Sequence, residues 1–142
     1  MNEADVQRIL SHPNAMIGSD GLPFDAHPHP RLWGTFPRVL GHYARDLGLF
    51  SLEEAVRRMT SLSAAQFDIV DRGTLKTGNF ADITVFDPAT VIDTASFERP
   101  MQAAAGIAHV FVNGREVWAD GGSTGNRPGR TLRHGQGVAA AA

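Results

Sequence analysis

The pattern of apolar residues changes once along the chain, near residue 73, and this change constrains the fold more than any other feature. Before it, apolar side chains recur at the spacing of amphipathic helices. After it, short runs rich in β-branched residues alternate with turn residues, as in strands. The sequence therefore predicts a helical segment over residues 1–73, a small antiparallel β unit over residues 74–134, and a low-complexity tail over residues 135–142.

Helix start and stop signals are frequent in the first segment. Ser51 and Glu54 have the spacing of a capping box, in which the two side chains satisfy N–H groups at the start of a helix. Ser63 begins a similar pattern, and Gly48 is typical of a helix end. These signals predict helices over residues 3–10, 35–47 and 63–69, and one that begins at Ser51.

The second segment contains a strong hairpin signal, Asn113-Gly114 between two β-prone runs. Strands are expected at residues 81–86, 106–112 and 116–118. Most of the buried area of this unit should come from Ile83, Val85, Val110, Val112, Val117 and Trp118. The substitution Val110→Asp should therefore unfold the β unit, because burying an unpaired charge is costly.

Composition and charge exclude several classes of protein. The 142 residues suffice for one ordinary domain, and 42% hydrophobic with 20% charged residues is typical of a packed chain. The net charge of −2 argues against a nucleic-acid partner, and Arg127, Arg130 and Arg133 are interpreted as a solvated segment. No cysteine is present, so disulfides and cysteine-based zinc sites are excluded. Neither a leader nor a membrane span is apparent, so no membrane partner and a cytoplasmic location are expected.

The residues that carry chemistry gather between positions 15 and 38. The apolar run Ala15-Met16-Ile17 is expected to form a buried strand that ends at Gly18. This strand delivers one carboxylate, Asp20, into a loop rich in glycine, proline and histidine, a setting typical of active sites. From the residues alone, two simpler interpretations stay open. Asp20 can cap its own turn, and Arg31 can stabilise the loop by a salt bridge or by hydrogen bonds to carbonyl groups.

The loop also contains His27 and His29, which have the His-x-His spacing of metal ligands. A pair of histidines without a third ligand makes a weak zinc site, so we expect both to be structural, or to contact a metal ligand rather than the metal itself. Trp33 and Phe36 are expected to pack within the loop or the core.

Two of these runs, Gly18-Ser19-Asp20-Gly21 and the run from Pro28 to Arg38, resemble the N-acyl-D-amino-acid deacylases, the D-aminoacylase branch of the amidohydrolase superfamily. Later motifs at residues 51–56, 71–75, 78–88 and 110–114 extend the likeness, which covers about residues 12–133. The β motifs occur widely among amidohydrolases, whereas the first two runs are specific to the deacylase branch.

The resemblance implies an α/β fold class in which the chain is the C-terminal portion of a (β/α)8 barrel enzyme. Residues 15–18 would be the last barrel strand, helices would follow, and the β unit would belong to a composite β-sandwich built from both chain ends. Asp20 would lie past the strand end, where barrel enzymes keep catalytic groups. In the family this aspartate approaches zinc and moves a proton from the metal-bound water to the leaving amine. Arg31 resembles the arginine that binds the α-carboxylate of the substrate.

The implied activity is hydrolysis of the linear amide bond of N-acyl-D-amino acids, with zinc as the cofactor of the complete enzyme. The His-x-His and the other metal ligands that this family carries on earlier strands have no counterpart in this sequence. We therefore expect the chain alone to bind no zinc, to be inactive, and to need self-association or a complementing N-terminal chain. The alternatives are a non-catalytic structural or interaction module derived from an amidohydrolase, and a ligand-binding β module that rests on fold analogy alone.

Overall fold

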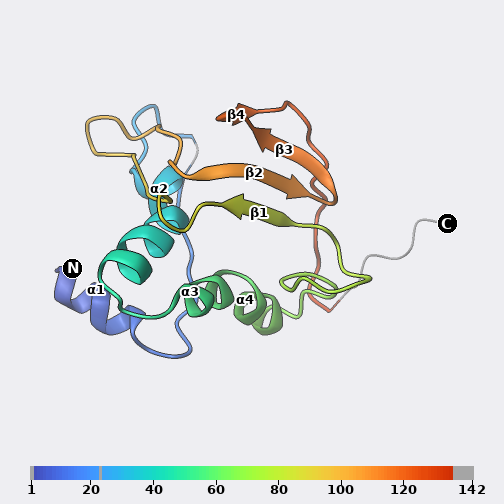
Figure 1. The fold of residues 1–142 in the computed structure, drawn as a ribbon, viewed down its shortest axis with the longest axis horizontal. Helices are drawn as coiled ribbons and strands as arrows, with labels where there is room; N and C mark the ends of the chain where they lie inside the picture. Colours follow the sequence, from blue (N-terminus) through green and yellow to red (C-terminus); the bar gives the residue numbers. More distant parts are fainter. Residues whose placement is uncertain (1, 23, 136–142) are drawn as a thin grey trace.

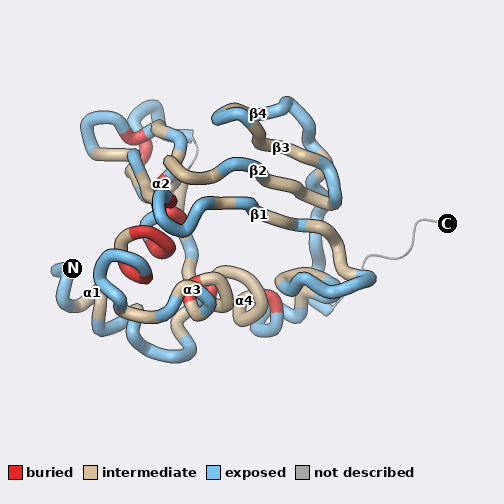
Figure 2. Tube along the Cα trace, in the orientation of Figure 1, coloured by how far each residue is buried: buried red, intermediate tan, exposed pale blue. Residues whose placement is uncertain are grey.

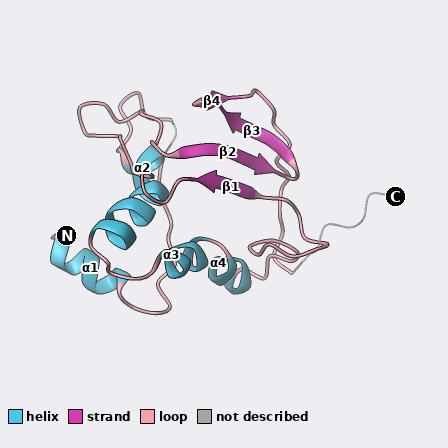
Figure 3. Cartoon of the chain, viewed as in Figure 1, coloured by secondary structure: helices cyan, strands magenta, loops and turns pink. Residues whose placement is uncertain are grey.

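The computed structural model describes residues 2–22 and 24–135, with helices in the first half and strands in the second (Figures 1 and 3). The elements in chain order are α1 (Glu3–Leu10), α2 (Arg31–Arg38), the π-helix η1 (Val39–Asp46), α3 (Leu52–Met59), α4 (Ser61–Gln66), β1 (Ile83–Phe86), β2 (Ile107–Val112), β3 (Arg115–Ala119) and β4 (Gly122–Ser123). The tail predicted for residues 135–142 lies outside the described residues, apart from Gly135. None of the described helices is long and apolar enough to cross a bilayer.

The first two predicted helices form, with one shifted start. α1 occupies the predicted residues 3–10, and the Asn2 side chain caps it by accepting a hydrogen bond from the Asp5 N–H at 2.9 Å. The helix predicted to begin at Thr35 begins four residues earlier, at Arg31. Pro30 precedes it with a φ of −56°, already suited to a helix, and proline costs no hydrogen bond at a helix start. The chain then continues through η1 to Asp46.

One of the two hydrogen bonds predicted for the capping box at Ser51 is present. Its Oγ accepts a hydrogen bond from the Glu54 N–H at 3.2 Å, but the Glu54 carboxylate binds Arg57 and Arg58 instead of returning to the helix start. The helix predicted to start at Ser63 starts at Ser61. Ser63 lies inside α4, where its hydroxyl donates to the Arg58 carbonyl oxygen at 2.9 Å.

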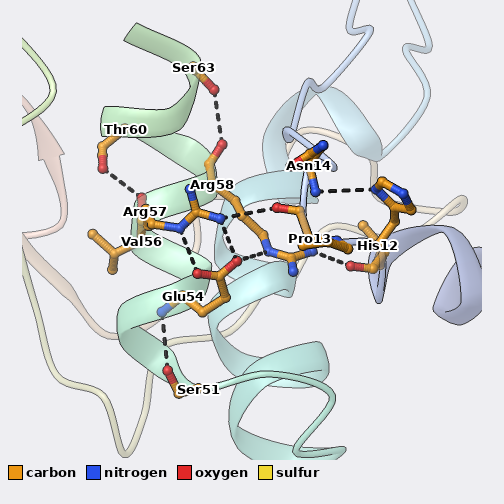
Figure 4. A network of polar contacts seen from close by, with 11 residues as sticks. His12, Pro13, Asn14, Ser51, Glu54, Val56, Arg57, Arg58, Thr60 and Ser63 are labelled. Atoms are coloured by element: carbon orange, nitrogen blue, oxygen red, sulfur yellow. Dashed lines mark hydrogen bonds and ion pairs between the residues drawn. The ribbon is translucent and has the colours of Figure 1, made fainter. Parts of the chain in front are cut away.

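The charged side chains of α3 join it to the segment that leads into the candidate site (Figure 4). Arg58, which is 3% exposed, donates to Glu54 at 2.7 Å and to the Leu10 carbonyl oxygen. Arg57 donates to the Pro13 carbonyl oxygen at 3.1 Å. Hydrogen bonds from Arg57 and then Arg58 lower the pKa of Glu54 to about 2. The end of α1 and residues 11–14 are thereby fixed to α3.

The β unit is a four-stranded antiparallel sheet with the order β1-β2-β3-β4. Asn113 and Gly114 connect β2 to β3 with φ of 49° and 75°, the positive values that a two-residue hairpin turn needs, so the predicted hairpin is confirmed. The strand predicted at residues 15–17 is wrong: these residues pair with no strand in the described part of the chain. An apolar run becomes a strand only beside another strand that completes its hydrogen bonds.

The buried core lies in the helical half rather than in the sheet. Figure 2 shows the buried residues on the helices and on loops, with none on the four strands. The core cluster consists of Val39, Leu40, Tyr43, Ala44, Ala55 and Val91. The six strand side chains predicted to be buried are only partly covered, and Val85 is 43% exposed. Phe86 and Ile107 pack against this core, whereas the other strand residues are at most partly buried.

The two halves meet where the segment after β1 docks on η1. Val91 is fully buried there, and its carbonyl oxygen accepts a hydrogen bond from Arg45 Nη1 at 2.8 Å. Gly41 allows this close approach, because a Cβ at that position would lie 2.2 Å from the same carbonyl oxygen. Other contacts join the same two parts of the chain: Arg38 pairs with Asp93 at 3.4 Å, and Phe86 of β1 and Ile107 of β2 pack against the core.

Candidate functional site

Asp20 and Arg31 lie against each other, although eleven positions separate them. Arg31 Nη2 is 2.8 Å from Asp20 Oδ2, and Arg31 Nε donates to the Asp20 carbonyl oxygen at 2.9 Å. One guanidinium therefore holds both the backbone and the carboxylate of the aspartate. Because Arg31 is the first residue of α2, the loop between them is closed onto the start of a helix.

The backbone around Asp20 presents its carboxylate outward. Asp20 has a φ of 48°, which is uncommon for a residue other than glycine. The adjacent Gly21 packs on Leu32, where a Cβ would lie 2.4 Å from Leu32 Cδ1. The Asp20 side chain is 82% exposed, and among the described residues its carboxylate accepts no hydrogen bond from its own turn. The turn-cap interpretation of Asp20 therefore does not match the structure.

The Arg31 contacts are those of the loop-stabilising interpretation. Its side chain is 41% exposed and binds Asp20 through Nε and Nη2. A guanidinium carries five N–H donors in a planar fork, and within the described residues the contacts of Arg31 use only Nε and one N–H of Nη2. Stabilising the loop does not exclude binding a substrate carboxylate, and that role stays a prediction.

His27 and His29 tie the site loop to residues 94–101, and the two loops lie side by side at the upper left of Figure 1. His27 Nε2 is 2.8 Å from the Phe97 carbonyl oxygen. The His29 ring packs edge-on against the Phe97 ring, with centroids 5.0 Å apart, and its Nδ1 accepts from the Arg31 N–H at 3.0 Å. Both histidines thus make structural contacts. Phe97 lies 70 positions away from His27, and no local sequence signal reveals this contact.

The described residues do not by themselves fit a metal ion. They contain no group of three or more histidine, aspartate or glutamate side chains that could hold one. Zinc sites in proteins use at least three protein ligands. The Asp20 carboxylate has suitable donor chemistry, but one of its oxygens is paired with Arg31, and among the described residues it belongs to no group of three potential ligands.

Residues 2–118 match the family model described as Amidohydrolase family. The chain belongs to this amidohydrolase family. Over 132 residues it is 64% identical to the D-aminoacylase of Alcaligenes xylosoxydans xylosoxydans, a match that covers 93% of this chain and 27% of that protein.

Solved amidohydrolase structures share the arrangement of the chain as well as its sequence. The crystal structure of a D-aminoacylase described as defining a novel subset of amidohydrolases superposes with a TM-score of 0.92 at 62% identity. The N-acyl-D-glutamate deacylase of Bordetella bronchiseptica, complexed with zinc and a phosphonate inhibitor, superposes with a TM-score of 0.88 at 54% identity. Both matches cover 94% of this chain, which spans about 28% of the length of each relative. The predicted resemblance to the deacylase branch is confirmed.

Proposed function

We propose that this chain forms the part of a metal-dependent N-acyl-D-amino-acid hydrolase that carries the proton-transfer residue, Asp20. One observation carries the proposal: an exposed carboxylate, held by an arginine eleven positions away, in a chain 64% identical to a D-aminoacylase. Residues 15–18 would take the place of the last barrel strand once neighbouring strands are present. The sheet would then belong to the composite β domain.

The chemistry assigned to Asp20 is proton transfer. Water attacks the amide carbonyl carbon, a C–O bond forms, and the C–N bond breaks to give a carboxylate and a free D-amino acid. The Asp20 carboxylate takes the proton from the attacking water and delivers it to the leaving nitrogen, so one group serves as base and then as acid. Its high exposure leaves room for a water molecule and a substrate beside it.

Zinc is named for the Bordetella relative, and we propose it as the cofactor of the complete enzyme. Residues outside the described segments would have to supply most of its ligands, since Asp20 adds one carboxylate at most. Arg31 is assigned to the α-carboxylate of the substrate through its uncommitted N–H groups, in the bidentate manner that guanidinium favours.

The test exchanges the matching segment of the Alcaligenes D-aminoacylase for residues 2–135 of this chain and measures release of free D-amino acid. We expect the chimera to hydrolyse N-acyl-D-amino acids. We expect Asp20→Asn to lower kcat by about 10²–10⁴-fold, because the amide cannot accept the proton. Asp25→Asn, an exposed acid of the same loop, is the matched control and should leave kcat unchanged.

Zinc content and thermal melting of each chimera separate loss of chemistry from loss of folding. A folded, zinc-loaded chimera in which Asp20→Asn keeps the parent rate would contradict the proposal.

A non-catalytic module is the second candidate, favoured by the lack of a metal-binding group among the described residues. It predicts that a folded chimera is inactive even with Asp20 intact. Both candidates require a partner surface, because several large apolar side chains are exposed, including Phe24 at 94% and Leu75 at 84%. We expect self-association or binding to a complementing chain, and light scattering that shows a stable monomer would oppose this.

A further inference from the structure

We propose that the tip of the β2–β3 hairpin and the segment after β4 form a binding site for a small phosphate-type oxyanion. A hollow of about 240 Å³ lies between them. It is lined by Asn113, Arg115, Asn126, Arg127, Pro128 and Arg130. None of these side chains is negatively charged, and three are permanently positive.

The three arginines come from two separate segments of the chain. Arg115 is the first residue of β3, whereas Arg127 and Arg130 follow β4. Arg127 and Arg130 are exposed, as the sequence interpretation of a solvated segment expects, and the fold also brings both beside Arg115. Arg133 does not line the hollow and keeps the simpler interpretation.

These positive charges have no counter-charge in the described part of the chain. None of Arg115, Arg127 and Arg130 takes part in any of its ion pairs. Of the acids near the hairpin, Asp82 pairs with Arg72, and Glu116 lies 2.7 Å from His109 Nδ1 rather than against one of the three arginines. The three like charges around this hollow repel each other. A bound anion would attract all three and so offset their repulsion.

The walls of the hollow are held in place without a ligand. Asn113 Nδ2 donates to the Pro128 carbonyl oxygen at 2.7 Å, while Asn113 Oδ1 accepts from Arg72. Asn126 Nδ2 donates to the Glu116 carbonyl oxygen at 2.8 Å. The segment after β4 is therefore fastened to the hairpin, which keeps the positions of the three arginines close together while their side chains stay exposed.

The positive charge around the hollow favours an anionic ligand. Guanidinium groups bind oxyanions through paired N–H donors, and several together favour a doubly charged phosphate group over a single carboxylate. The hollow is smaller than the roughly 300–1,000 Å³ typical of sites for drug-sized ligands. The net charge of −2 disfavours a nucleic acid. A free phosphate ion or the phosphate group of a small metabolite fits these conditions.

The experiment is calorimetric titration of the 142-residue chain with inorganic phosphate at constant ionic strength, and it does not depend on the proposed hydrolase activity. We expect saturable binding of one phosphate per chain. Replacing Arg127 and Arg130 together by glutamine should weaken it by at least about tenfold, because charge-assisted hydrogen bonds are lost. Arg115→Lys keeps the charge but removes the planar fork, and should weaken binding less.

Arg133→Gln is the matched control and should change the affinity less than about twofold, since this side chain lies outside the hollow. A small phosphomonoester is titrated in parallel. Tighter binding of inorganic phosphate indicates a site for the free ion, and tighter binding of the phosphomonoester indicates a site for the phosphate group of a metabolite. The proposal is overturned if phosphate does not saturate the chain, if the double variant binds as the parent does, or if Arg133→Gln causes the same loss. Thermal melting verifies that each variant is folded.

Discussion

The helical half and the β half of this chain are stabilised in different ways. The helices enclose a core in which Ala55 and Val91 have no exposed surface. The sheet has no buried residue, and its strands are held by their hydrogen bonds, by the Asn113-Gly114 turn and by the contact at Val91. The difference indicates that the core is built on the helices with Val91 inserted from the β half, whereas most of the sheet surface is left for other polypeptide to cover. The site loop ends at the start of α2, which continues into η1 and this core.

The largest effect should follow Val91→Asp. Val91 is fully buried where the two halves meet, so the variant would bury a charge without a partner. We expect a loss of about 3–5 kcal/mol in the free energy of unfolding, measured by urea titration. If the loss were below about 1 kcal/mol, the contact at Val91 would not be what joins the halves.

A smaller loss is expected for Gly41→Ala, which forces a Cβ to within 2.2 Å of the Val91 carbonyl oxygen. Overpacking of this kind costs about 1–3 kcal/mol, visible as a lower melting temperature. Gly18→Ala is the matched control, because nothing lies within 4 Å of its added Cβ. Equal melting temperatures for the two variants would argue against the close approach of η1 to Val91.

Val110→Asp tests the open sheet directly. Sequence reasoning expects it to unfold the β unit, but Val110 is only partly buried, so we now expect a loss of about 1 kcal/mol in the isolated chain. In the chimera with the Alcaligenes enzyme the loss should rise to several kcal/mol, because covering polypeptide would bury the charge. The same loss in both settings would mean that nothing covers this face.

The last prediction concerns pH and the helical half alone. Hydrogen bonds from Arg57 and Arg58 lower the pKa of Glu54 to about 2 in the folded chain, from an ordinary value of 4.5. Its contribution to stability is therefore complete above pH 4.5 and is lost as the pH falls toward 2. Urea midpoints at pH 6 and pH 3 should differ less in Glu54→Gln than in the parent, while Asp25→Asn should keep the parent difference.

Sequence patterns predict the local caps and turns correctly, but they do not predict which side chains the rest of the chain buries. The residues of α1, the Ser51 cap and the Asn113-Gly114 turn follow from short-range chemistry, and all three form. The strand at residues 15–17 and the buried sheet side chains depend on neighbours that the described chain does not supply. Within the site, the resemblance identifies Asp20 and Arg31. Their direct contact and the contact of His27 with Phe97 join residues that are far apart in the sequence, so short sequence patterns do not predict them.

Amide hydrogen exchange, measured residue by residue on this chain and on the chimera, is the most direct test of the contrast between the halves. In the isolated chain we expect the amides of η1 and α3 to exchange most slowly, and those of β1 to β3 to exchange much faster. In the chimera the strand amides should become as protected as the helical ones. Equal protection of both halves in the isolated chain, or no gain for the strands in the chimera, would contradict the account, in which the helices hold the buried core and most of the sheet surface is uncovered.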